Sequence, residues 1–220
     1  MAKKDNKKLF LIIVPVLMVA VLLIGVTIAY LSATSSLTNH FVVGSFNLPT
    51  TDPITSNPKV LTQYLDEPSW NDAQTHKLLP GASFQKDPYV GIGAGSESAV
   101  VYIYVDNKFT DNVYFAINNG WTAVANETVP GSLNGTYTSG LFKYTAGLTG
   151  VANNDSWTST PLFSNIVISD DATDEDFVVD QGQDTIINVS SFIHQANDAS
   201  GNPISSSTIE AAAKNAFGLN

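Results

Sequence analysis

The 220-residue chain is acidic, with 20 Asp and Glu residues, 10 lysines and no arginine, and its net charge at pH 7 is −10. A chain with so few cations is poorly suited to neutralise phosphates, which argues against nucleic-acid binding. The chain also contains no cysteine, so disulfides, thiol catalysis and cysteine-ligated zinc are excluded.

The first 29 residues have the pattern of a secretory signal peptide. Lysines near the N-terminus precede an uncharged, mostly apolar run over residues 9–29. The run ends in a Thr-x-Ala sequence, which predicts cleavage between Ala29 and Tyr30. Its length is also that of a transmembrane helix, so the alternative is a retained membrane anchor with the lysines inside. Both interpretations place residues 30–220 outside the cytoplasm.

Residues 30–220 predict one domain of short β-strands. The strongest strand signal covers residues 100–105, which are β-branched or aromatic throughout, as in a strand buried on both faces. Further strands are expected over residues 113–117, 162–168 and 184–193. Turn-forming residues fill the intervals between them. This pattern favours an all-β fold, an antiparallel sandwich or barrel.

Two Asn-Gly pairs, Asn119-Gly120 and Asn134-Gly135, predict tight turns, the first of them a hairpin that leads into Trp121. The glycine-rich residues 91–95 lack the lysine of a phosphate-binding loop, so we expect a turn or bulge there. Residues 49–69 contain four prolines and predict a long surface excursion.

The C-terminus predicts a short helix. Ser207 and Glu210 have the spacing of a capping box, good helix formers follow, and Gly218 is placed as a stop. We expect one apolar face of this helix to pack on the edge of the sandwich. That face carries Ile209, Ala213, Ala216 and Phe217.

No arrangement of catalytic residues is evident in the sequence. The three histidines, His40, His76 and His194, lie in separate contexts. None belongs to a His-Glu-x-x-His motif, which would place two zinc ligands beside a general base. No Gly-x-Ser-x-Gly nucleophile elbow is present either. The sequence therefore predicts a protein that is not an enzyme.

One acidic cluster is a candidate binding site, and it comprises Asp170, Asp171, Asp174, Glu175 and Asp176. Calcium prefers several carboxylate and carbonyl oxygens gathered by one loop, so the four aspartates are candidate calcium ligands. The spacing does not match an EF-hand, because no glycine occupies the bend position. The alternative is a solvated loop between strands, and no other cofactor is expected.

The order of several segments resembles that of the TasA/camelysin family, exported proteins of Gram-positive bacteria and relatives. Thr-Asn-His-Phe-Val-Val-Gly over residues 38–44 resembles the T-N-x-F-x-x-G stretch of the family, and Lys-Asp-Pro over residues 86–88 resembles another of its motifs. The other similar segments are residues 79–81, 99–103, 121, 160–166 and 193–196. The likeness spans most of residues 30–220, whereas residues 91–94 and the inserts at 50–75 and 123–160 depart from it.

The resemblance implies a jelly-roll-like β-sandwich, preceded by a signal helix that a specialised signal peptidase removes. It also implies a structural function, as a subunit of extracellular fibres in a biofilm matrix. In the family, the segment exposed by cleavage adds as a strand to the next subunit, and residues 30–48 would be that donor here. The inserting side chains would be Phe41, Val43, Phe46 and Leu48. The alternative is that this stretch is the first strand of its own sandwich.

Two other functions are alternatives to the fibre subunit. The first is a monomeric surface or adhesion module, anchored in the membrane by residues 9–29. The second is a metalloprotease, since some family members carry that label. The partners expected for the fibre subunit are further copies of the chain and a signal peptidase, with membrane contact only through residues 9–29 before cleavage.

Overall fold

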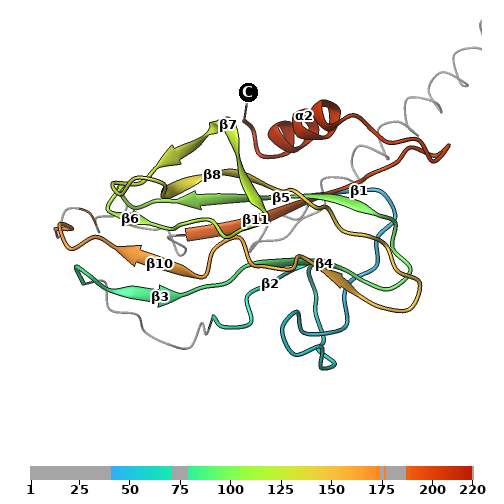
Figure 1. Cartoon of the computed structure of the whole chain (residues 1–220), viewed down its shortest axis with the longest axis horizontal. Helices are drawn as coiled ribbons and strands as arrows, with labels where there is room; N and C mark the ends of the chain where they lie inside the picture. The colour runs from blue at the N-terminus through green and yellow to red at the C-terminus, as the bar shows by residue number, and fades with distance from the viewer. Residues whose placement is uncertain (1–40, 71–78, 174–175, 177–186, 220) are drawn as a thin grey trace, which may run out of the picture. The chain divides into compact units, whose positions relative to one another are not determined.

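The computed structural model describes residues 41–70, 79–173, 176 and 187–219, and Figure 1 shows their arrangement. This part of the chain is mostly β, with eleven strands in three sheets and one short helix. Within it, no helix is long and apolar enough to cross a membrane. The expected signal peptide, residues 1–29, lies outside the described residues.

The largest sheet has five strands in the order β1-β11-β5-β8-β7. Their bounds are β1 (Phe41–Val43), β11 (Ile187–Gln195), β5 (Ala99–Asn107), β8 (Tyr137–Tyr144) and β7 (Trp121–Pro130). Neighbours are antiparallel except β1 and β11, which run parallel. The expectation of a purely antiparallel sheet was therefore wrong at this edge. A parallel neighbour needs a long crossover, and nearly the whole domain lies between these two strands.

Two sheets of three strands each have the orders β3-β10-β6 and β2-β4-β9. Their bounds are β2 (Leu65–Asp66), β3 (Ser83–Gln85), β4 (Tyr89–Ile92), β6 (Val113–Tyr114), β9 (Ser156–Trp157) and β10 (Asn165–Ile168). Hydrogen bonds bridge the break between the sheets: the Lys86 amide donates to the Ser164 carbonyl at 3.1 Å, and the Leu162 amide to the Pro88 carbonyl at 3.0 Å. Together they form a second layer, which Figure 1 shows beneath the five-stranded sheet.

The main hydrophobic core collects side chains from all three sheets, as in a β-sandwich. At its centre, the ring centroid of Phe115 lies 4.4 Å from that of Phe163 and 5.6 Å from that of Phe142. Val101, Ile103 and other core side chains are fully buried around these rings. Each fully buried large apolar side chain contributes about 1.5–3 kcal/mol, so this core is the main source of stability.

Helix α2 (Ser206–Ala216) covers the opposite face of the five-stranded sheet. Ile209 and Ala213 are buried there, and the ring of Phe217 stacks on Tyr104 with centroids 5.0 Å apart. The prediction that residues 100–105 are buried on both faces is confirmed, and so is the apolar face of the helix. Its expected place on the sandwich edge was wrong. The central strands carry large apolar side chains on this outer face, namely Tyr102, Leu141 and Phe192.

The predicted helix cap also differs from the structure. Ser205 is the N-cap, and its hydroxyl accepts a hydrogen bond from the Thr208 amide at 3.2 Å. The expected box of Ser207 and Glu210 was placed two residues too late. Three consecutive serines offer three possible caps, and only Ser205 has the extended backbone that an N-cap needs.

The two Asn-Gly turns have different roles. Asn134-Gly135 joins the paired strands β7 and β8, as a hairpin turn should. Asn119-Gly120 also forms a turn, closed by a hydrogen bond from the Trp121 amide to the Asn118 carbonyl at 3.2 Å. The expected hairpin was wrong, however, because β6 pairs with β10 while β7 pairs with β8. This turn carries the chain from one layer to the other.

Candidate assembly site at the N-terminal edge

Strand β1 forms one edge of the five-stranded sheet. Its three residues pair in register with β11, with Val42 opposite Ile193 and Val43 opposite His194. By contrast, nine residues of β11 pair with β5 on its other side. Val43 is 37% exposed. Within the described residues, the edge strand therefore pairs with β11 at three positions, and its Val43 is partly exposed.

Gly44 ends the edge strand and turns the chain away from the sheet. Its φ of +131° is rare for residues with a side chain. A Cβ atom here would also lie 2.9 Å from the Phe46 ring and 3.0 Å from the Gln195 side chain. Both the backbone conformation and the crowding require glycine, which gives a physical reason for the last residue of the T-N-x-F-x-x-G stretch.

The chain beyond Gly44 is held firmly by the domain. The Asn47 amide donates to the Ser96 hydroxyl at 2.9 Å, and the Gly93 amide donates to the Asn47 carbonyl at 2.7 Å. Phe46 packs against the main core, and its carbonyl accepts from the Tyr64 hydroxyl at 3.1 Å. The transition from edge strand to anchored chain therefore occurs at Gly44.

Asp155 adds a second anchor from a loop more than one hundred residues away. Its carboxylate accepts from the Thr50 amide at 2.6 Å, the Thr51 hydroxyl at 2.7 Å and the Ala94 amide at 3.1 Å. Burial raises the pKa of Asp155, but these hydrogen bonds outweigh burial and hold the pKa below its ordinary value. The ionised carboxylate thus connects Thr50 and Thr51, at the start of the 49–69 excursion, with its own loop and with the loop that contains Ala94.

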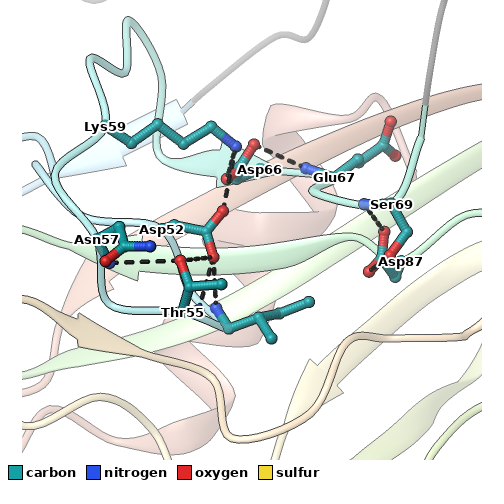
Figure 2. A network of polar contacts seen from close by, with 9 residues as sticks. Asp52, Thr55, Asn57, Lys59, Asp66, Glu67, Ser69 and Asp87 are labelled. Atoms are coloured by element: carbon teal, nitrogen blue, oxygen red, sulfur yellow. Dashed lines mark hydrogen bonds and ion pairs between the residues drawn. The ribbon is translucent and has the colours of Figure 1, made fainter.

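A polar network fixes the rest of this excursion (Figure 2). The Asp52 carboxylate accepts from the amides of Ile54 and Thr55, at 3.0 and 2.8 Å. Lys59 bridges two carboxylates, with Nζ 2.6 Å from Asp66 and 3.6 Å from Asp52. Burial raises the pKa of Asp52, but the amide hydrogen bonds and the lysine together lower it. The excursion is therefore ordered, but the expected surface position was wrong at its end, where Leu65 and Asp66 form β2 and Leu65 is buried in the main core.

The Lys-Asp-Pro motif is structural in this chain. Lys86 is only 6% exposed, and its Nζ lies 2.6 Å from a Glu67 carboxylate oxygen and 4.4 Å from the centre of the Trp70 ring. The Asp87 carboxylate accepts from the amide and hydroxyl of Ser69, at 2.9 and 2.7 Å. Both charged side chains thus hold the end of the excursion against β4, a role that the sequence alone did not reveal.

The four predicted donor side chains do not share one environment. Val43 lies on the edge strand, and the Phe41 backbone pairs with Phe192. Phe46 packs on the core of its own domain. Leu48 is 38% exposed, and its carbonyl lies against Gly93. The predicted donor segment is therefore better bounded at Val43 than at Leu48. The predicted cleavage site, Ala29 and Tyr30, lies outside the described residues.

The structure describes three residues of the acidic cluster, namely Asp170, Asp171 and Asp176. Asp170 and Asp171 are exposed, and Asp174 and Glu175 lie outside the described residues. Asp176 accepts hydrogen bonds from the Thr110 hydroxyl, the Thr173 amide at 2.7 Å and the Asn112 side chain at 3.2 Å. These bonds, that of Thr110 foremost, hold its pKa at about 2. Calcium binding by this loop stays a prediction.

In the described part of the chain, no three His, Asp or Glu side chains lie close enough together to hold a metal ion. His194 is buried on β11, with Nδ1 2.8 Å from the Gln195 carbonyl oxygen. His40 and His76 lie outside the described residues.

Comparisons of the chain with protein-family models, curated proteins and solved structures gave no match. A functional argument therefore has to start from the geometry of this chain, and its clearest feature is the N-terminal edge.

Proposed function

We propose that the chain is an exported structural protein that assembles into extracellular fibres or matrix by donating its N-terminal strand. The observation that carries this proposal is the contrast at Gly44. A parallel edge strand, described from Phe41 to Val43, precedes this glycine, and a chain anchored by Asn47, Asp155 and the excursion network follows it.

Exchange of this strand between subunits replaces one ladder with an identical one. When β1 leaves, β11 exposes an edge of unpaired amides and carbonyls, which is a template for another strand. The β1 of a second copy has the same sequence and can restore the same register, as in domain swapping. Main-chain hydrogen bonds then provide affinity, and alternating side chains provide specificity. Polymerisation follows if each subunit donates to the next rather than back to its donor.

The finer fold and the location belong to the same proposal. The chain repeatedly crosses between the two layers, which supports a jelly-roll-like sandwich. These crossings run from β5 to β6, from β6 to β7, from β8 to β9 and from β10 to β11. Cleavage after Ala29 would free the donor from residues 9–29. Export is supported by the signal pattern of these residues and by the acidic composition of the chain, which favours solubility of the subunit.

Electron microscopy of two chains tests the proposal. Residues 30–220 are expected to form fibres, whereas a chain that starts at Ser45 is expected to stay soluble. Monomers from both chains would contradict self-assembly and favour an anchored surface module. Fibres from both would contradict donation by β1.

A disulfide lock sharpens this test, because the natural chain has no cysteine. Val43 and His194 are register partners, so the double variant V43C/H194C can link β1 to β11. Oxidised as a monomer, it is expected to stay monomeric. Reduced, assembled and then oxidised, it is expected to give disulfide-linked multimers on a non-reducing gel. The single variants V43C and H194C are the controls, and fibres from the oxidised monomer would contradict the proposal.

A further inference from the structure

The two Asn-Gly turns share a dipeptide and are both exposed, but they differ in what holds the peptide between the two residues. This difference matters because Asn-Gly is the sequence at which an asparagine side chain most readily reacts with its own backbone. Glycine has no side chain to hinder the approach of its nitrogen to the asparagine carbonyl carbon. Because both asparagines are exposed, exposure alone does not predict which of Asn119 and Asn134 reacts faster.

The Asn134-Gly135 peptide is held only at the ends of its turn. The Thr136 amide donates to the Leu133 carbonyl at 3.1 Å, and Gly135 has a φ of +80°, as at the third position of a type II turn. Among the described residues, no hydrogen bond involves the Asn134 carbonyl or the Gly135 amide. Apart from the turn's own residues 134–136, no described atom lies within 4 Å of the place where a Gly135 Cβ would be. This central peptide can rotate while the turn remains closed.

The Asn119-Gly120 peptide is held directly. The Asn119 carbonyl accepts from the Thr160 hydroxyl at 2.7 Å. The Gly120 carbonyl accepts from the amide and hydroxyl of Thr145, at 2.8 and 2.9 Å. The Tyr144 ring lies 3.3 Å from the place of a Gly120 Cβ. Rotation of this peptide breaks the bond to Thr160 and pushes the turn against neighbouring atoms.

We propose that Asn134 is a site of spontaneous succinimide formation and deamidation in the folded protein, whereas Asn119 is protected by the fold. The Gly135 backbone nitrogen attacks Cγ of Asn134 and loses its proton. The bond from Cγ to the side-chain nitrogen breaks, and ammonia leaves. Water then opens the five-membered ring at either carbonyl, which yields aspartate or isoaspartate. No oxidant or reductant takes part.

The modification adds a negative charge at the tip of the β7–β8 hairpin, and isoaspartate also lengthens the backbone by one carbon. The open space around Gly135 accommodates both changes. The subunit therefore acquires charge with age without unfolding. The same reaction at Asn119 would disturb the crossing between layers, where the Trp121 indole donates to the Thr160 carbonyl at 3.1 Å.

The test follows both asparagines in the purified full-length chain in detergent, aged at 37 °C and mapped by peptide mass spectrometry. Isoaspartate is labelled with an isoaspartyl methyltransferase. In the folded protein Asn134 is expected to react at least about tenfold faster than Asn119, the rate equivalent of about 1.4 kcal/mol. In urea, where both turns are lost, the two rates are expected to be similar. Circular dichroism of the aged protein is expected to be unchanged.

Two variants show whether the held peptide is the cause. T160V removes the hydroxyl that binds the Asn119 carbonyl and is expected to accelerate the reaction at Asn119 while leaving Asn134 unchanged. G135A is expected to slow the reaction at Asn134. Equal rates at the two sites in the folded chain, or an unmodified Asn134 in an aged folded sample, would overturn the proposal.

Discussion

The two edges of the five-stranded sheet are built in opposite ways. Edge strand β7 has ten residues, a bulge between Ala123 and Thr128, and a proline at its end. Its Glu127 carboxylate lies 3.3 Å from Lys214 of α2. Edge strand β1, described from Phe41 to Val43, runs parallel to its neighbour and is followed by Gly44. The β7 edge contacts the helix as well as the sheet, whereas the described residues of β1 pair with β11.

The two edges differ in the features that oppose pairing with another strand. Bulges and prolines are devices that stop edge strands from pairing with other chains, and β7 has both. The edge at β1 has neither device within Phe41–Val43. Under the proposed function, partners would therefore add at the β1 edge and not at β7.

The largest effect is expected at the β7 edge. Gly140 on β8 has a φ of +132°, and a Cβ there would clash with the Glu127 carbonyl and lie 2.5 Å from the Thr128 Cα. Since these are backbone atoms, G140A must displace the bulge itself. We expect a loss of about 3 kcal/mol in the free energy of unfolding, measured by urea denaturation. The neighbouring variant S139A is the control, and a loss below about 1 kcal/mol for G140A would show that the bulge is not a fixed feature.

An intermediate effect is expected at Asp155, which anchors the chain beyond Gly44. D155N keeps the size of the side chain but removes its charge, so at pH 7 we expect a loss of about 2 kcal/mol. The pKa of Asp155 is lowered in the folded state from the ordinary value of 3.8, so its stabilisation is present above that value. It is lost as the pH falls through the lower, folded-state pKa. The difference between the wild type and D155N should therefore shrink in acid.

Urea denaturation at pH 7 and at about pH 3 measures this difference. The matched control is D171N, which changes an exposed carboxylate and is expected to alter stability by less than about 0.5 kcal/mol. A difference between the wild type and D155N that stays constant with pH would contradict the assigned role of the charge.

The sequence predicts best what depends on local pattern. The β-branched run at residues 100–105 identified the central strand β5, and the spacing of Ile209, Ala213 and Phe217 identified the buried face of α2. Leu162 and Phe163 were assigned to a strand because they are apolar, yet they are buried outside β10. Apolar character indicates burial, whereas strand pairing also depends on a partner strand elsewhere in the chain.

The candidate site was the least predictable part, since its contacts join distant residues. Thr50 and Asp155 are 105 positions apart, and nothing in either local sequence identifies the other. The parallel pairing of β1 with β11 is similarly non-local. The one signal that sequence did provide was Gly44, whose positive φ explains why a glycine follows the edge strand.

The smallest effect is expected at Gly44 itself. G44A meets side chains rather than backbone, because the nearest atoms belong to Phe46 and Gln195. The overlap is smaller than at Gly140, with the Phe46 ring at 2.9 Å and the Cβ and Oε1 atoms of Gln195 at 3.0 Å, so we expect a loss of about 1–2 kcal/mol, and loosening of β1 rather than of the domain. G201A is the matched control, because Gly201 has a φ of +82° with nothing within 4 Å of its Cβ position, and it isolates backbone strain from crowding. Urea denaturation gives the global loss, and amide hydrogen exchange in β1 gives the local one. If G44A costs as much as G140A, the N-terminal edge is as integral to the domain as β7, and a replaceable strand is contradicted.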